Sequence, residues 1–124
     1  MIPDRPYWIE MEDRSDYLWV AVGGDRLDAQ ISAAYWNEIA ERCFESGQDR
    51  ILIEKDFPKP VDPPEMLQMA EHLGRLLPNR RIAFYDRHGH KSINELGKRL
   101  ARNRDVLMQV FDSTDEAEKW LRAN

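Results

Sequence analysis

The order of helical and strand patterns is the feature of this sequence that most restricts its fold. After Gly23-Gly24, three segments with helical apolar spacing alternate with three short apolar runs, and a fourth helical segment follows. Strands joined by helices in this way run parallel in one sheet, with right-handed crossovers. Two earlier apolar runs, separated by a short polar stretch, predict an antiparallel hairpin. The sequence therefore predicts an α/β fold of order ββαβαβαβα, with a single mixed, mainly parallel five-stranded sheet and four helices.

The predicted strands are short runs of aliphatic, β-branched and aromatic residues. They cover residues 7–11, 17–22, 50–54, 81–85 and 106–111, with residues 12–16 as the polar hairpin turn. The second run is apolar almost throughout, which is typical of a strand covered on both faces. Four prolines place residues 56–64 in a loop after the third strand.

The predicted helices have apolar residues at every third or fourth position. They cover residues 28–46, 62–77, 92–101 and 113–121, and Gly47 is a natural stop for the first. The other three helices begin with a residue that can cap the helix, followed three positions later by Glu. These predicted capping boxes are Asp62 with Glu65, Ser92 with Glu95 and Ser113 with Glu116.

Length and charge bound the class of protein. The 124 residues fit one domain, residues 1–124, and the net charge of −5 disfavours a nucleic-acid partner. The single cysteine, Cys43, lies on the apolar face of the first predicted helix, so a core thiol in a reducing compartment is expected. The first eight residues lack the apolar run of a secretory signal, and no stretch approaches the ~20 apolar residues of a membrane span. We expect a cytoplasmic protein with no transmembrane segment.

The second half of the chain carries a family resemblance. Residues 81–86 (RIAFYD), 110–112 (VFD) and 116–121 (EAEKWL) are similar to the ending of STAS-like domains of the bacterial SpoIIAA-like branch, related to the sporulation anti-sigma-factor antagonist. The first half matches in outline, through the hairpin ending at Gly23-Gly24 and the strand at 50–54. The resemblance covers most of the chain, with motifs of modest specificity.

The resemblance implies a non-catalytic regulatory or protein-interaction module, and so not an enzyme. The alternative is a carrier or sensor of a small apolar or lipid-like ligand, at the membrane surface if the basic residues between 75 and 104 meet anionic lipid. A homodimer is also compatible with it. Phosphoregulated relatives carry Ser or Thr at the start of the helix after the third strand, whereas residues 56–64 contain neither. We therefore do not expect this chain to have the phosphorylation switch of those relatives.

Candidate ligand or partner residues follow from the expected topology, because ligands meet parallel sheets at the carboxyl ends of their strands. The polar candidates are in two loops of this edge, and the apolar ones are in the proline-rich loop and the next helix. They are Asp56, Phe57, Val61, Met66, Met69, Asp86, His88 and His90. Exposed, Phe57 and Val61 would form a binding patch or a lid over an apolar pocket; buried, they would close the edge of the sheet.

The spacing of Asp86, His88 and His90 offers two or three metal ligands, but a solvated loop turning at Gly89 accounts for it as well. Ser92 beside His90 could be a nucleophile, but its expected role is the helix cap. We therefore predict no metal site, no cofactor and no catalytic residue.

Overall fold

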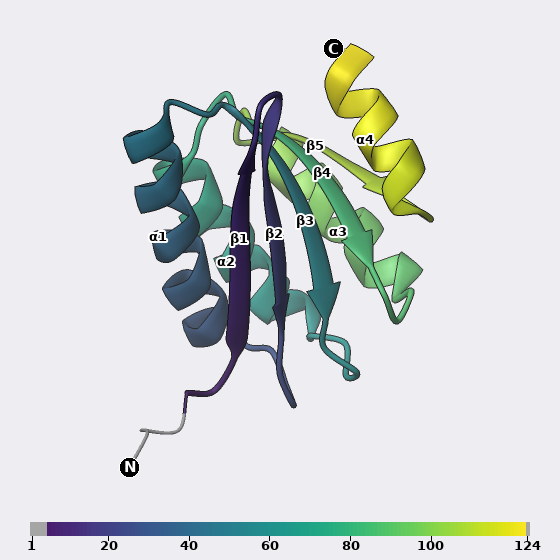
Figure 1. Ribbon diagram of the computed structural model, residues 1–124. Coiled ribbons are helices and arrows are strands. Elements are labelled where there is room, and N and C mark those ends of the chain that lie inside the picture. Colours follow the sequence, from purple (N-terminus) through teal and green to yellow (C-terminus); the bar gives the residue numbers. More distant parts are fainter. Residues whose placement is uncertain (1–4, 124) are drawn as a thin grey trace.

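The computed structural model describes residues 5–123, and its nine elements follow the predicted order (Figure 1). The strands and helices are β1 (Trp8–Arg14), β2 (Tyr17–Gly23), α1 (Ala29–Ser46), β3 (Arg50–Asp56), α2 (Pro63–Leu76), β4 (Arg81–Asp86), α3 (Lys91–Arg102), β5 (Leu107–Phe111) and α4 (Thr114–Ala123). The predicted fold class is confirmed. In this part of the chain, no helix has both the length and the apolar character needed to cross a membrane.

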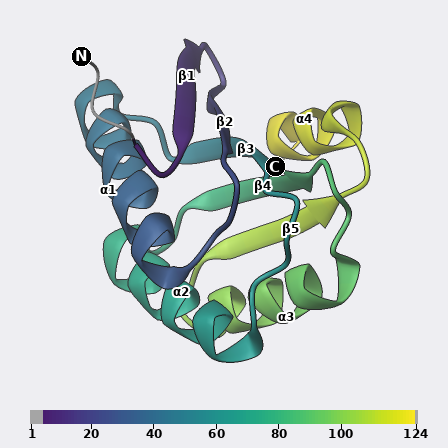
Figure 2. The ribbon, with the colours of Figure 1, turned by 90° about the horizontal axis from the view of Figure 1, so that it is seen from below.

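The five strands lie side by side in sequence order, β1-β2-β3-β4-β5, with β1 antiparallel to β2 and the remaining pairs parallel. Each crossover moves the chain one strand further in the same direction. Crossovers of one hand then place their helices on one side of the sheet. Figure 2 shows α1, α2 and α3 on that side and α4 alone on the other.

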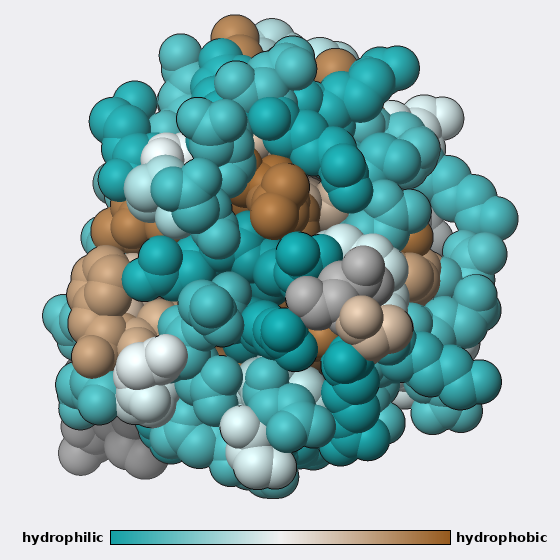
Figure 3. All heavy atoms as spheres, turned by 90° about the horizontal axis from the view of Figure 1, so that it is seen from above, coloured by the Kyte–Doolittle hydropathy of each residue, from teal (hydrophilic) through white to brown (hydrophobic). Residues whose placement is uncertain are grey.

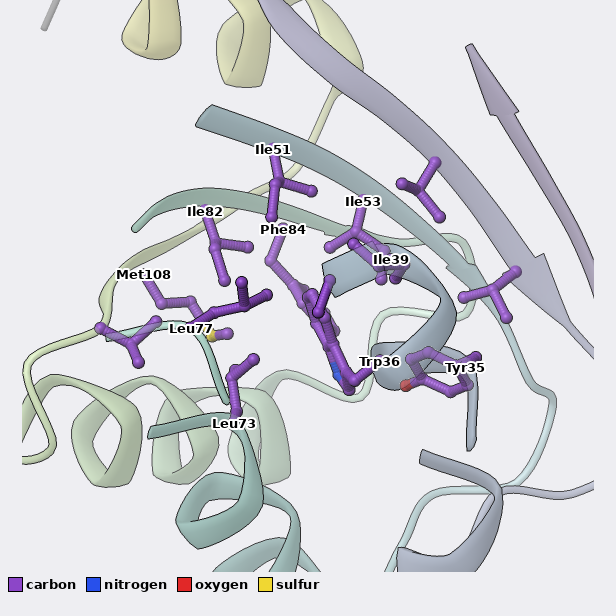
Figure 4. Close-up of a cluster of buried hydrophobic side chains, with 14 of the residues drawn as sticks. Tyr35, Trp36, Ile39, Ile51, Ile53, Leu73, Leu77, Ile82, Phe84 and Met108 are labelled. Atoms are coloured by element: carbon purple, nitrogen blue, oxygen red, sulfur yellow. The ribbon is translucent and has the colours of Figure 1, made fainter. Parts of the chain in front are cut away.

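The main core lies between the sheet and the three helices. Inward-facing residues alternate along the strands, so Ile51 and Ile53 of β3 share this face with Ile82 and Phe84 of β4. In Figure 4 these side chains point toward the helices. They belong to the same core cluster as Trp36 of α1, which is 4% exposed. A smaller core on the other face joins α4 to β3, β4 and β5. It consists of Tyr17, Leu52, Ala83, Ala117 and Leu121.

Two helix ends form as the sequence predicts. The helix α1 ends at Gly47, as predicted, and the φ of 74° there suits glycine. Its start, for which no cap was predicted, is capped by Asp28, which accepts a hydrogen bond from the Ile31 amide at 2.8 Å. At α4, the Ser113 hydroxyl accepts from the Glu116 amide at 3.2 Å and lies 3.2 Å from the Glu116 carboxylate. The Ser113 half of this capping box is confirmed, whereas the Glu116 carboxylate meets the Ser113 hydroxyl in place of its backbone amide.

The other two predicted capping boxes are wrong. Asp62 precedes α2 and Pro63 begins it, but the Asp62 side chain makes no cap hydrogen bond. Glu65 instead accepts from the Ala29 amide at 2.5 Å and so ties α2 to the start of α1. The helix α3 begins one residue early, after His90 in a left-handed conformation (φ 40°), which places Ser92 inside the first turn. At α2 a tertiary hydrogen bond replaces the local motif, and at α3 the earlier helix start removes Ser92 from the capping position.

Two strands run two or more residues further than predicted. The strand β1 continues to Arg14 because its polar end still pairs with β2, with Arg14 opposite Tyr17. The strand β3 continues to Asp56. Lys55 is paired with both neighbouring strands, whereas Asp56 is paired with Gly23 of β2. The extra residues of β3 decide where the Lys55 side chain goes.

Candidate functional site

The carboxyl ends of β2, β3 and β4 meet at one end of the molecule, which Figure 2 shows from below. The structure brings Asp56, Phe57, Asp86, His88 and His90 together there. Figure 3 shows the opposite end, where β2–β5 begin, and its surface is largely hydrophilic with small, separate hydrophobic areas.

Hydrogen bonds between the two loops use most of the polar groups at this edge. The His88 ring nitrogen Nε2 lies 2.7 Å from Asp56 Oδ1, and the His90 Nε2 lies 3.2 Å from the Phe57 carbonyl oxygen. Asp86 accepts from the His88 amide at 2.8 Å and from Asn94 Nδ2 at 2.9 Å. These groups therefore hold the β3 and β4 loops together. Among residues 5–123, no three His, Cys, Asp or Glu side chains are grouped as metal ligands.

The apolar candidates are core residues. Phe57 is 3% exposed and stacks on the Tyr35 ring at 6.2 Å, and Val61 is 9% exposed. Val61 forms a small buried cluster with Met66 and Met69, which α3 covers. The structure thus settles the alternatives left open for Phe57 and Val61 in favour of burial.

Two small cavities lie between the sheet and the α2–α3 pair. The inner one has a volume of about 40 Å³, and the outer one, under the proline-rich loop, about 20 Å³. Lys55, Met66 and Asn94 line both. Gly97 and a set of mainly apolar side chains complete the lining of the inner cavity. These side chains are Trp36, Met69, Ala70, Leu73, Phe84, Ala101 and Met108. We call this pair of spaces the Lys55 cavity.

Lys55 is the one charged side chain of the inner cavity. It is 6% exposed, and its Nζ lies 4.9 Å from the centre of the Phe84 ring. Among the described residues, the Nζ atom has no hydrogen-bond or ion-pair partner. Burial lowers the pKa of Lys55 to about 8, and the negative charge of Asp86 partly opposes this shift.

The sequence prediction missed Lys55 because it ended the third strand at residue 54. A signal was nevertheless present, because Ile51, Ile53 and Lys55 stand at alternate positions of one strand and so face the same side. Cys43, by contrast, was predicted as a core residue and is 1% exposed, and burial raises its pKa to about 11.

A second site lies on the face of the sheet that carries α4. This helix packs on β3, β4 and β5 and leaves β1 and part of β2 uncovered. A pocket of about 240 Å³ opens between this face and the start of α4. We call the surface around it the acidic aromatic face, and its residues are Trp8, Glu10, Glu12, Arg14, Tyr17, Trp19, Glu54, Asp115 and Glu118.

Hydrogen bonds orient the rings of this face. Trp19 Nε1 donates to Glu54 at 2.6 Å, and the Tyr17 hydroxyl donates to Glu118 at 2.5 Å. Burial, followed by the Glu118 hydrogen bond, raises the pKa of Tyr17. The Arg14 guanidinium lies over the Trp19 ring at 4.9 Å, and Trp8 is 42% exposed. None of these residues was a sequence-based candidate, because only strand register and the position of α4 bring them together.

No protein-family model and no curated sequence matches this chain. The chemistry of both sites is therefore inferred from their own side chains.

Proposed function

We propose that this chain is a non-catalytic regulatory or protein-interaction module of STAS-like type, which binds a basic segment of a partner protein on its acidic aromatic face. The observation that carries the proposal is an open sheet face on which exposed and half-buried tryptophans lie beside a surplus of carboxylates. The element order and the resemblance of residues 81–121 to STAS-like domains support the same class of function.

Aromatic side chains supply the contact area for a partner. Trp8 is 42% exposed at the edge of the sheet, and Trp19 is half-buried in the pocket. Tryptophan is among the residues that most often dominate binding energy at protein interfaces. A 240 Å³ pocket next to such rings offers a place in which a side chain of a partner can be buried.

Charge specifies what kind of segment fits. Five carboxylates belong to the face, whereas its cations are Arg14 and, from the next turn of α4, Arg122, which pairs with Glu118 at 3.4 Å. A basic segment would neutralise the surplus. Arg14 also shows how a cation is held here, since its guanidinium lies 4.9 Å above Trp19 and donates to Glu12 at 3.0 Å.

Peptide titration followed by amide NMR tests the proposal. An arginine-rich peptide of about ten residues, long enough to follow one face of a sheet, should shift the amides of β1, β2 and the start of α4. A glutamate-rich peptide of the same length should not. Replacing Glu10 and Glu12 by lysine should weaken binding at least tenfold, since two attractive charges become repulsive.

A matched variant distinguishes this face from the overall negative charge. Glu41→Lys with Glu45→Lys makes the same change of charge on the exposed side of α1, on the other side of the sheet. This variant should bind within about twofold of the wild type once salt screens long-range attraction. Equal weakening in both double variants, or shifts spread over the whole surface, would contradict a specific site.

The Lys55 cavity favours a second candidate, the sensing of a small ligand. Its inner space of about 40 Å³ is apolar on most of its wall. A water molecule needs about 10–15 Å³ of such space, so the cavity holds a few non-hydrogen atoms and not the acyl chain of a lipid. The lipid-like ligand of the sequence-based alternative would require α2 to move away from α3.

A further inference from the structure

We propose that the Lys55 cavity binds a small monocarboxylate, with the carboxylate on the Lys55 ammonium and a short apolar tail between α2, α3 and the sheet. This site lies on the opposite side of the sheet from the acidic aromatic face, so the proposal is independent of the proposed function.

The ammonium group of Lys55 provides the first part of the argument. Its side chain is more than nine-tenths buried, lines both cavities and lacks any hydrogen bond or ion pair within residues 5–123. A lysine ammonium carries three hydrogen-bond donors, and burying it without a partner costs free energy. An anion entering the cavity would meet a buried cation that no side chain of the described residues pairs with, and each carboxylate oxygen would accept one of its donors.

The nearest anion of the protein is already committed elsewhere. Asp86 is the partner of Lys55 in the β3–β4 register, yet no ion pair within 4.0 Å joins the two. Its carboxylate oxygens accept from the His88 amide and from Asn94 Nδ2, which hold it toward the β4–α3 loop. Asp86 therefore moderates the positive charge of Lys55 without occupying its donors.

The walls of the cavity select the rest of the ligand. Methionine, leucine, phenylalanine and alanine side chains line most of the inner space. Besides the Lys55 ammonium, the polar groups in its described lining are the Asn94 side chain and the ring nitrogen of Trp36. The two spaces of about 40 and 20 Å³ together hold roughly four to six non-hydrogen atoms, on a scale of about 10–15 Å³ for one water. Carboxylates of three or four carbons have this size.

The outer cavity provides a route to Lys55. It lies under the proline-rich loop, where exposed Lys59 and half-buried His90 line it together with Val61 and the carboxylate of Asp86. The thioether side chain of Met66 separates this space from the inner one, and methionine adapts its shape easily. A carboxylate would thus pass from Lys59 to Lys55, beside an Asp86 carboxylate that already accepts hydrogen bonds from the His88 amide and Asn94.

Methionine methyl groups provide a direct readout. Met66, Met69 and Met108 line the inner cavity, whereas Met11 lies on β1. In a ¹H–¹³C spectrum, sodium butyrate should shift the three cavity methyls saturably and leave Met11 in place. 1-Butanol and butylammonium chloride have the same tail without the carboxylate, and both should bind at least tenfold more weakly.

Two variants identify the group responsible. Lys55→Met keeps the length of the side chain and removes the charge, and it should weaken butyrate binding at least tenfold while 1-butanol binding is retained or improved. Lys119→Met removes the same charge from α4, and butyrate affinity should stay within twofold. The proposal is overturned if butyrate up to about 50 mM, the weak end of measurable affinity, shifts no cavity methyl, or if Lys55→Met binds it as well as the wild type.

Discussion

Replacing Lys55 by methionine should stabilise this protein at neutral pH. Methionine has nearly the same length and fills the same space between Phe84 and Met66, so the packing of the inner cavity is kept. The substitution removes a cation that is 6% exposed and has no hydrogen bond or ion pair in the described part of the chain. Apolar replacements of buried charged groups are often neutral or stabilising.

The lowered pKa of Lys55 sets the size of the effect. Moving that pKa from 10.5 to about 8 corresponds to about 3 kcal/mol of lost stability when the amine is charged, at about 1.36 kcal/mol per pH unit. The contact of Nζ with the Phe84 ring offsets about 1 kcal/mol of this loss. Lys55→Met should therefore raise the free energy of unfolding by about 2 kcal/mol at pH 7.

The sign of the pH dependence follows from proton binding. Between pH 8 and 10.5 the unfolded chain holds the Lys55 proton more tightly than the folded protein, so the cost of Lys55 is complete below pH 8 and fades as the pH rises through this window. The other charged or titratable groups that line the outer cavity with Lys55 are Asp86, Lys59 and His90, and all three are present in both proteins.

Urea unfolding followed by tryptophan fluorescence measures this difference. At pH 7 the variant should be more stable by about 2 kcal/mol, and near pH 9.5 the advantage should fall below about 1 kcal/mol. Lys119→Met serves as the control and should stay within about 0.5 kcal/mol of the wild type at both pH values. A variant less stable than the wild type at pH 7, or an advantage that does not shrink with rising pH, would refute the reasoning.

Three further substitutions test the local structure by the same unfolding measurement. Asp28→Ala removes the side chain that caps α1 at Ile31 and should cost about 1 kcal/mol, whereas an unchanged stability would show that the cap is dispensable. Gly23→Ala places a methyl group 2.5 Å from the Asp56 carbonyl oxygen and 2.7 Å from the Trp8 ring, so a loss of about 1–3 kcal/mol is expected; a neutral result would mean that β2 and β3 can separate at no cost. Asn94→Ala leaves Asp86 and the Gly89 carbonyl without their Asn94 partner and should cost about 1–3 kcal/mol, with amide shifts in the β4–α3 loop, and the absence of both effects would contradict the bracing role of Asn94.

Local patterns predicted the elements of the fold well. A period of two or of three to four residues in the apolar positions is a property of the chain itself, and it indicated all five strands and four helices in their correct order. Helix ends were predicted less well, because a cap competes with tertiary partners. Glu65 bonds to the start of α1 and leaves the predicted capping box at Asp62 unformed.

The candidate sites depend on more than local pattern. The gathering of Asp56, Phe57, Asp86, His88 and His90 at one edge follows from parallel topology, and that topology was readable from the element order. Whether such groups are free or already bonded depends on distances between loops. The hydrogen bond of His88 to Asp56 spans 32 residues of chain, and no sequence spacing specifies it.

The amino-acid sequence by itself determined the class of fold and the order of its elements, because burial of apolar side chains imposes a period that each segment shows on its own. Only the tertiary structure decided which polar groups matter. Lys55 became a buried cation because β3 extends to Asp56 and α2 and α3 close over it. The acidic aromatic face exists because α4 packs on β3, β4 and β5 and leaves β1 uncovered. Both outcomes depend on how distant segments pack together, and this packing sets the solvation and the partners of each charge.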